Sequence, residues 1–309
     1  MNRVMNFLYC FDNRYNVQGA VSIYSLLSNL NEKVDLHIIH NNPKSFDKFT
    51  KKINKHQNLN KINIYEFDEI NHDFPNLGES HVTYATYFRM FIQNYLPEDI
   101  DYLIYLDADV VCVENPTDML KEIKEQMYQN NSPLAALTEG RRNTSTSFFE
   151  NLGIQNDKYF NAGIIIIDFQ QWIKNNTLKN MLKIMKEKYK RIIYWDQDIM
   201  NLHFEGNYLE IPRSMNYTPS DGVTMSEEKI YFHHYAGSKK PWYFSFVFRD
   251  ISENYQQAYK NLFNNKFHVT MKFKKHEIKL LINILISRKF KLRNKIQLIY
   301  GTFKTKILD

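Results

Sequence analysis

The first 110 residues alternate between segments typical of strands and segments typical of helices. Apolar runs take turns with stretches in which apolar residues recur at helical spacing. In chain order these segments are Met5–Phe11, Val17–Asn29, Val34–His40, Phe46–Lys55, Ile62–Phe67, Tyr84–Asn94 and Tyr102–Leu106. A strand thus begins and ends the series, with helices between the strands. This order predicts an α/β fold with a mostly parallel sheet flanked by helices.

The pattern continues less regularly beyond residue 110. We expect three more strands, at Leu134–Thr138, Ala162–Asp168 and Ile230–His234, and two more helices, at Gln170–Tyr189 and Asp196–Phe204. The four consecutive isoleucines in the second of these strands are typical of a buried strand. The polar stretch Gly140–Asn151 predicts a mobile loop.

The charge of the chain is unevenly distributed. From residue 271 onward, eleven Lys and Arg stand against two acidic residues, a net charge of +9, so residues 1–270 carry −3 of the chain's +6. We therefore expect a main domain over residues 1–265 and a basic, amphipathic helical tail over residues 266–309. Two interpretations of the tail stay open: peripheral contact with an anionic membrane face, or a cap on the main domain. Nothing in the tail resembles a nucleic-acid-binding module.

Composition also indicates the setting of the protein. Cys10 and Cys112 both lie in apolar runs, which is typical of buried thiols rather than of a disulfide framework. The N-terminus lacks the features of a secretory signal, and no segment has the roughly 18 to 20 apolar residues that span a bilayer. We expect a cytoplasmic protein, peripheral at the inner membrane face if the tail binds there. The bias toward Asn, Lys, Ile and Tyr indicates an AT-rich bacterial genome.

Two aspartates follow the apolar strand Tyr102–Leu106. In open α/β sheets, ligands bind beyond the carboxyl ends of the strands, where Asp107 and Asp109 stand on either side of Ala108. Side chains two apart on an extended segment point the same way, so both carboxylates can converge on one divalent cation. Carboxylate oxygens suit Mn²⁺ or Mg²⁺. The alternative for these residues is an ordinary turn at the end of a strand.

A second set of candidates begins at His234, after the last predicted strand. An imidazole there can complete a carboxylate-rich metal site, and Lys240 can reach phosphate oxygens as a point charge. Gly237 would let the backbone approach a diphosphate closely, and Pro241 would stiffen the turn. A single histidine more often has a structural role, so the motif is informative mainly together with the two aspartates.

Six segments match the motifs of one known family in the family's order. They are Asp12–Tyr15, His81–Arg89, Leu106–Asp109, Tyr159–Gly163, Trp195–Asp198 and His234–Trp242. On these motifs, roughly residues 4 to 245 resemble glycosyltransferase family 8, a retaining group that includes bacterial lipo-oligosaccharide galactosyltransferases, glycogenin and streptococcal adhesin glycosyltransferases. The resemblance implies the Rossmann-like GT-A fold. It also implies transfer of galactose or glucose from a UDP-sugar to a glycan or glycoprotein acceptor, with Mn²⁺ or Mg²⁺.

The resemblance implies a catalytic centre with the metal bound by Asp107, Asp109 and His234. It adds three residues at the reacting bond: Gln197, Asp196 and Lys240. An amide is a poor nucleophile compared with a carboxylate, so we expect the acceptor to attack from the same face as the leaving group. The metal and the lysine would stabilise the leaving diphosphate, and the amide would shape the charge around an oxocarbenium-like centre.

The resemblance also implies a binding site for the sugar donor. The uridine, diphosphate and sugar would contact Cys10, Phe11, Asp12, Tyr15, His81, Arg89, Asp107, Ala108, Glu139, Asn161, Ala162, Gly237 and Lys240. Phe11 and Tyr15 would supply apolar or stacking surface to the uridine. Glu139 departs from the galactosyltransferase pattern, which has a shorter aspartate there, so the choice between galactose and glucose stays open.

Two other functions fit parts of the sequence. A non-catalytic protein that binds sugar nucleotides or glycans is the first, but a degenerate copy most readily loses a metal ligand, and all three ligands and Lys240 are present. A nucleotidyltransferase is the second, but residues Cys10–Asn13 stand where a Gly-rich phosphate loop is expected. We therefore favour a transferase, with a cell-surface glycoprotein or a wall glycan as the expected acceptor.

Overall fold

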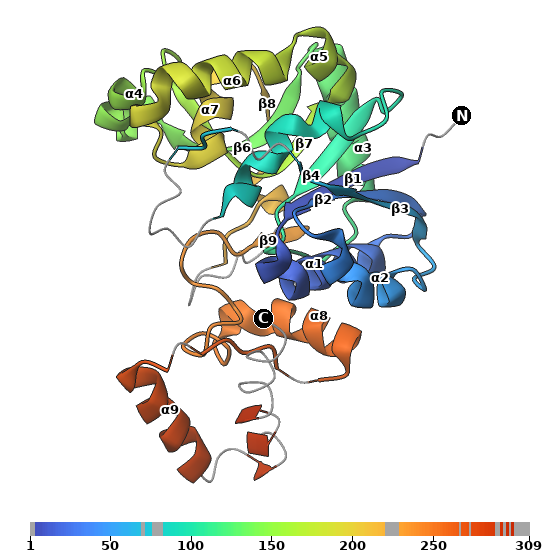
Figure 1. Cartoon of the computed structure of the whole chain (residues 1–309), viewed down its shortest axis with the longest axis vertical. Coiled ribbons are helices and arrows are strands. Elements are labelled where there is room, and N and C mark those ends of the chain that lie inside the picture. The colour runs from blue at the N-terminus through green and yellow to red at the C-terminus, as the bar shows by residue number, and fades with distance from the viewer. Residues whose placement is uncertain are drawn as a thin grey trace.

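A twisted seven-stranded sheet forms the centre of the main domain, with helices on both faces (Figure 1). The computed structural model describes residues 4–68, 72–75, 83–219, 229–265, 267–271, 273–287, 291–292, 295–296 and 298–299. The sheet has the order β3-β2-β1-β4-β7-β6-β8. Its strands are β1 Met5–Phe11, β2 Val34–His40, β3 Leu59–Glu66, β4 Tyr102–Leu106, β6 Leu134–Arg141, β7 Lys158–Asp168 and β8 Leu209–Glu210. Only β7 runs antiparallel to its neighbours, so the predicted mostly parallel sheet is confirmed.

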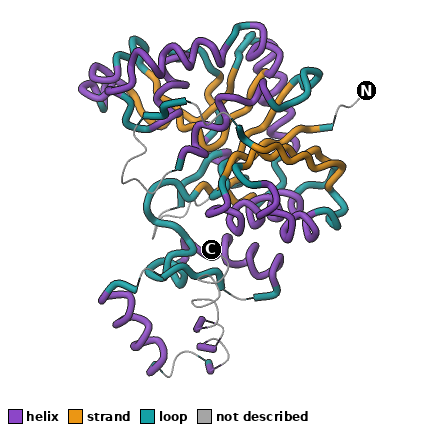
Figure 2. The backbone as a smooth tube through the Cα atoms, in the orientation of Figure 1, coloured by secondary structure: helices purple, strands orange, loops and turns teal. Residues whose placement is uncertain are grey.

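Each face of the sheet is covered by its own apolar layer of helices. One layer contains α1 Asn16–Asn29, α2 Asp47–Ile53, α3 Thr117–Gln129 and α8 Glu253–Phe263. The other contains the 3₁₀ helix Tyr84–Asn94 together with α5 Phe169–Lys174, α6 Thr177–Lys188 and α7 Trp195–Phe204. Figure 2 shows the strands running between these two sets of helices.

The strands supply both layers because successive side chains point to opposite faces. In β1, Phe7 and Tyr9 enter one layer, and Leu8 and Cys10 enter the other. The four isoleucines of β7 alternate in the same way and contribute to both layers, which confirms the predicted buried strand. Both cysteines are buried and free, which confirms the prediction for the thiols.

The prediction of a mobile loop over Gly140–Asn151 is wrong. Strand β6 continues to Arg141, a 3₁₀ turn follows, and α4 spans Thr146–Leu152. Helix α4 buries Phe149 and Leu152, and Gly153 ends it in the left-handed conformation at φ +85°, which glycine adopts without steric cost. Two buried apolar side chains therefore order a segment whose overall polarity is typical of a loop.

The single helix predicted over Gln170–Tyr189 is two helices. The break falls between α5, which ends at Lys174, and α6, which begins at Thr177. Asn176 stands in the break with φ +51°, in the left-handed region that asparagine tolerates better than most residues. The asparagine pair at this point was therefore a signal for the break.

In the view of Figure 1, the C-terminal part of the chain lies below the sheet. Residues 267–271 and α9 (Lys275–Ile286) share a small apolar cluster with Phe244 and Val247. Figure 1 shows α9 projecting away from the α/β body. Among the described residues, no helix is both long and apolar enough to cross a membrane.

Candidate active site

A cavity of about 720 Å³ opens at the carboxyl ends of strands β1, β4 and β6. Most residues that the sequence singled out line it: Cys10, Phe11, Asp12, Tyr15, Arg89, Asp107, Ala108, Asp109, Glu139, Asn161, Asp196, Gln197, His234, Gly237 and Lys240. Ala162 lies behind the wall, where its backbone N–H donates to the Gln197 Oε1 at 2.9 Å. His81 lies outside the described residues.

Asp107 and Asp109 lie in the turn that joins β4 to the short strand β5 (Val110–Cys112). The backbone N–H of Val110 donates to the Asp107 carbonyl at 3.1 Å and closes the turn. The two carboxylates converge through this turn rather than along an extended segment, which was the geometry that the sequence suggested.

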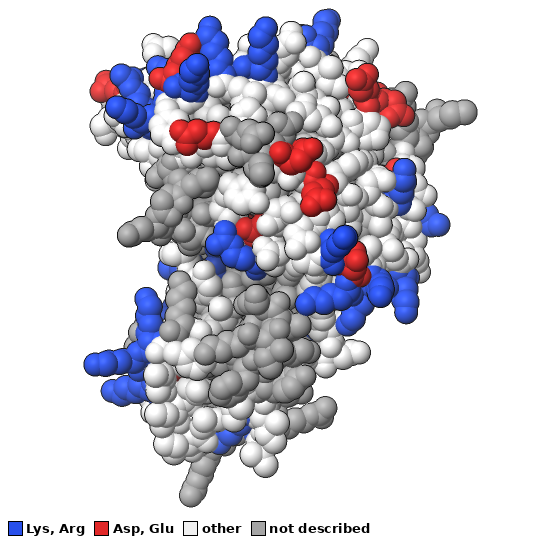
Figure 3. Space-filling view, viewed as in Figure 1, with Lys and Arg blue, Asp and Glu red and all other residues white. Residues whose placement is uncertain are grey.

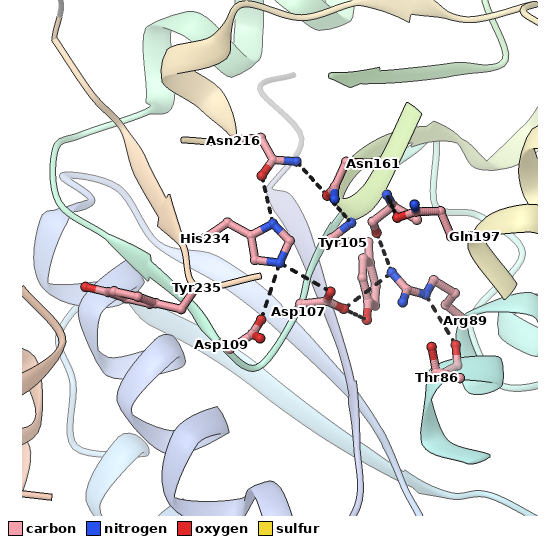
Figure 4. Close-up of polar contacts among 12 residues, drawn as sticks. Thr86, Arg89, Tyr105, Asp107, Asp109, Asn161, Gln197, Asn216, His234 and Tyr235 are labelled. Atoms are coloured by element: carbon pink, nitrogen blue, oxygen red, sulfur yellow. Dashed lines mark hydrogen bonds and ion pairs between the residues drawn. The ribbon is translucent and has the colours of Figure 1, made fainter. Parts of the chain in front are cut away.

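His234 reaches the same point from the other side. It ends β9 (Phe232–His234), which pairs antiparallel with β5 so that His234 faces Val110. Its Nε2 lies 3.7 Å from Asp107 Oδ2 and 3.5 Å from Asp109 Oδ1 (Figure 4). One ligand atom from each of these residues lies within 4.8 Å of the others, so the three side chains can hold one metal ion.

Asn216 fixes the orientation of the imidazole. Its amide nitrogen donates to Asn161 Oδ1 at 3.0 Å, so its Oδ1 faces His234 Nδ1, at 2.8 Å, and accepts the proton there (Figure 4). The lone pair of the histidine then lies on Nε2, toward the aspartates, as a metal ligand requires. Sequence reasoning missed Asn216, because no local spacing relates it to the other site residues.

Gly163 provides the space that the imidazole occupies. A Cβ atom at this position would lie 2.1 Å from His234 Cε1, which is far inside contact distance. Its carbonyl also accepts from the backbone N–H of Asp107 at 2.8 Å. The glycine therefore lets two ligand-bearing segments approach each other closely.

The buried carboxylate of Asp109 has one oxygen satisfied and one free. Oδ2 accepts from Lys240 Nζ at 2.5 Å, whereas Oδ1, among the described residues, has no hydrogen-bond partner. Burial raises the pKa of Asp109, but the ammonium group of Lys240 opposes this effect, and the pKa lies below its usual value. A buried, ionised oxygen without a hydrogen-bond donor is costly, and a cation beside His234 Nε2 would satisfy it. The three side chains thus fit a divalent metal.

Arg89 lies on the other side of Asp107 and joins it to Asp196. Its guanidinium is buried, with Nε 2.6 Å from Asp196 Oδ2 and Nη1 3.3 Å from Asp107 Oδ1. Thr86 donates to the second Asp196 oxygen at 2.5 Å. Burial raises the pKa of Asp196 to about 6, against the opposing effects of Arg89 and Thr86. Asp196 is only 1% exposed, so its carboxylate is almost fully buried in the cavity wall.

Both ends of the Gln197 amide are held at the cavity wall. Besides the bond from Ala162 to Oε1, Nε2 donates to Tyr159 OH at 3.2 Å and to Glu139 Oε2 at 3.4 Å. Glu139 Oε2 also accepts from Asn161 Nδ2 at 3.2 Å. The predicted sugar-side residues Glu139, Asn161 and Gln197 therefore form one hydrogen-bonded group.

The predicted uridine side of the cavity lies at the end of β1. Asp12 is buried and caps the turn Asn13–Tyr15 by accepting from the backbone N–H of Arg14 at 3.0 Å. Phe11 is 2% exposed and packs against Gly19, so most of its ring belongs to the core. The ring of Tyr15 is more accessible and meets Trp242 edge-on at 6.1 Å.

The chain is similar to known glycosyltransferases. The sequence profile of glycosyl transferase family 8 matches residues 6–245. The chain is 29% identical over 269 residues to lipopolysaccharide 1,3-galactosyltransferase of Salmonella typhimurium. This alignment covers 83% of this chain and 78% of the relative. It is 30% identical over 257 residues to lipopolysaccharide 1,2-glucosyltransferase of Escherichia coli K12, with 77% of this chain and 73% of the relative covered.

A solved structure shares the fold. The crystal structure of galactosyltransferase LgtC in complex with donor and acceptor sugar analogues superposes with a TM-score of 0.71 at 20% sequence identity. The match covers 84% of this chain and 96% of that one. This likeness confirms the GT-A fold.

Proposed function

The chain belongs to glycosyltransferase family 8, and we propose that it transfers galactose or glucose, with retention, from a UDP-sugar to a glycan with the help of a divalent metal. The relatives named above include a galactosyltransferase and a glucosyltransferase, which supports a hexose as the transferred sugar. The observation that carries the proposal is the buried Asp109 oxygen that has no hydrogen-bond partner among the described residues, inside the group Asp107, Asp109 and His234. Besides the metal ion, the ammonium group of Lys240 would place a positive charge beside this group.

In this proposal, the metal ligands and Lys240 both act on the diphosphate that leaves during transfer. Asp107, Asp109 and His234 would hold Mn²⁺ or Mg²⁺, which when bound neutralises charge on a departing diphosphate. Lys240 is buried, and its ammonium group lies beside Asp109, within reach of the same diphosphate. Because these charges are fixed before the reaction, little reorganisation is needed as the bond breaks.

The contacts of Asp196 favour attack from the face of the leaving group. A covalent intermediate needs a carboxylate free to attack the sugar, but one oxygen of Asp196 pairs with Arg89 and the other accepts from Thr86. Gln197 offers an amide, which is a poor nucleophile. A glycosyl adduct detected on Asp196, Gln197 or Glu139 by mass spectrometry would contradict this mechanism.

Aromatic side chains at the cavity rim support a glycan acceptor. Phe148 on α4 and Tyr194 before α7 both line the cavity, and their ring centroids are 5.8 Å apart. Phe148 also packs edge-on against Tyr159 at 5.2 Å, so its position is supported from within. Apolar aromatic surface with a few polar groups is typical of small-molecule sites, and it suits the apolar face of a sugar. A wall glycan or a surface glycoprotein provides such a sugar.

The proposal is tested by the release of UDP from UDP-galactose and from UDP-glucose in the presence of Mn²⁺ and a mixture of glycan acceptors. We expect turnover with one of the two donors, and loss of that turnover when the metal is chelated. No release from either donor, together with no binding of UDP, would overturn the proposal. UDP binding without release from any donor would instead favour a non-catalytic protein that binds sugar nucleotides.

We also propose that α9 contacts an anionic membrane. The exposed residues of α9 and its N-cap Lys274 combine apolar side chains with lysines: Ile278, Leu280, Ile282, Ile286, Lys274, Lys275 and Lys279. Figure 3 shows basic side chains on the flank of the molecule where α9 lies in Figure 1. Apolar residues beside lysines on one exposed helix are typical of helices that lie in the membrane interface.

Reversing two charges on α9 is expected to weaken binding to vesicles that contain anionic lipid. Each lysine near such a surface contributes on the order of 1 kcal/mol, so a Lys275→Glu, Lys279→Glu variant should bind at least about tenfold more weakly in a sedimentation assay. The control is Lys179→Glu, Lys186→Glu on α6, which makes the same charge change at another exposed helix. Equal loss in the two variants would reduce the effect to net charge, and no loss would leave α9 only a packing role.

A further inference from the structure

We propose that helix α8 and residues 267–271 position Lys240 for the sugar donor, with Gln256 as the central positioning residue. This segment lies beyond residue 245, where the match to the family profile ends. The inference rests on the proposed role of Lys240 at the diphosphate. It assigns a function to a region that neither the family motifs nor the composition of the chain indicated.

Lys240 is the last residue of the loop that begins at Tyr235, and the position of its side chain depends on the backbone of this loop. The residue is 4% exposed, and its ammonium group donates to Asp109 Oδ2 and, at 2.8 Å, to the Tyr235 carbonyl. The loop from Tyr235 to Lys240 contains Gly237 at φ +73°, and among the described residues, chain neighbours apart, no atom lies within 4 Å of the position that a Cβ would take there. None of the described residues packs on this side of the loop, so its position depends on the segments at its two ends: β9 before it and the residues that follow Lys240.

Gln256 ties those residues to the C-terminal segment. Its Nε2 donates to the Pro241 carbonyl at 2.8 Å and to the His268 carbonyl at 3.0 Å, while its Oε1 accepts from the His268 N–H at 2.8 Å. All of these groups are buried, so each would lack a partner if the amide were removed. The amide thus joins the residue next to Lys240 to a segment 27 residues further along the chain.

Two further backbone bonds extend the connection. The N–H of Thr270 donates to the Trp242 carbonyl at 2.7 Å, and the N–H of Phe244 donates to the Thr270 carbonyl at 3.0 Å. With these bonds, residues 267–271 pair with the chain immediately after Lys240. The C-terminal segment therefore fixes one end of the Lys240 loop, as β9 fixes the other.

Aromatic packing links the same segment to the predicted uridine side. The Trp242 ring lies 6.1 Å from His268, in a stacked arrangement, and 6.1 Å from Tyr15, edge-on. Tyr255 packs against Trp242 at 5.0 Å, and its hydroxyl lies 2.6 Å from His268 Nδ1. Trp242 is 2% exposed, and its ring packs between the C-terminal segment and Tyr15, which lines the cavity.

The test measures, by titration calorimetry, the affinities of Gln256→Ala and of the native chain for UDP and for uridine. Loss of the amide should weaken UDP binding by about tenfold, the effect of one or two net hydrogen bonds, and should weaken uridine binding much less because uridine carries no phosphate. Gln256→Met, which keeps the length of the side chain, is the second variant. Gln257→Ala is the matched control, because this neighbour is exposed and, among the described residues, its side chain bonds to Asn261 on the same helix.

A double-mutant cycle separates positioning from simple destabilisation. In a Lys240→Ala background, Gln256→Ala should cause little further loss of UDP affinity, because both changes act through one side chain. Equal weakening of UDP and uridine, additive losses, or unchanged UDP affinity would each overturn the inference. A native chain that binds no UDP would remove the proposed function itself. UDP binding that is sensitive to Lys240 but not to Gln256 would remove only the inference.

Discussion

Replacing Asp107 and Asp109 together by asparagine is expected to reduce UDP release by at least about a thousandfold, which corresponds to about 4 kcal/mol of lost transition-state stabilisation. The double substitution keeps the volume of both side chains but removes both anionic ligands of the proposed metal site. It also removes the charge that pairs with buried Lys240. The measurement is the initial rate of UDP release with saturating Mn²⁺ and the preferred sugar donor.

Uridine binding provides the control for folding in this variant. The predicted uridine side lies at the end of β1, at Cys10 to Tyr15, and contains no ligand of the metal. The variant should therefore bind uridine as the native chain does. Retention of more than about a tenth of the native rate, in a variant that still binds uridine, would show that these carboxylates do not hold an essential metal.

A single methyl group at Gly163 is expected to weaken Mn²⁺ binding by about a hundredfold. This is the upper end of the range for residues that support metal ligands, and it applies because the methyl would displace a ligand itself. In the structure, the Cβ of Gly163→Ala would fall 2.1 Å from His234 Cε1, so the imidazole must leave its place between the two aspartates. Calorimetric titration with Mn²⁺ in the presence of UDP measures the effect.

The companion variant His234→Ala shows whether the methyl acts through the imidazole. In that background the clash is gone, so adding Gly163→Ala should cost little further Mn²⁺ affinity. Additive losses would mean that the glycine acts through the backbone of β7 instead. Unchanged Mn²⁺ affinity in Gly163→Ala alone would mean that His234 is not a ligand.

Local patterns in the sequence predicted much of the fold. Strands β1, β2 and β4 have the predicted bounds, because each is a short apolar run between polar residues. Helix α3 was not among the predictions, although its buried Leu120 and Ile123 recur at helical spacing. The residues of the site were found through motifs that follow strand ends, where side chains from distant parts of the chain meet.

Other features depend on contacts between segments far apart in the sequence. Asn216 acts on the histidine 18 positions later, and Gln256 acts on backbone groups on both sides of it. A polar residue in such a role has no periodicity or spacing of its own. Likewise, the basic composition after residue 265 gave no sign that Phe267, Val269 and Met271 are buried, because net charge does not report the burial of short apolar segments.

The central claim is that Asp107, Asp109 and His234 hold a divalent metal beside the diphosphate of a UDP-sugar. Its most direct test is a crystal structure of the chain with MnCl₂ and UDP, with diffraction data collected at a wavelength where manganese scatters anomalously. We expect one strong anomalous peak within coordination distance of these three side chains, with a phosphate oxygen on the same ion and Lys240 beside the diphosphate. A UDP molecule bound in the cavity with no anomalous peak at these residues, or with the peak elsewhere, would contradict it.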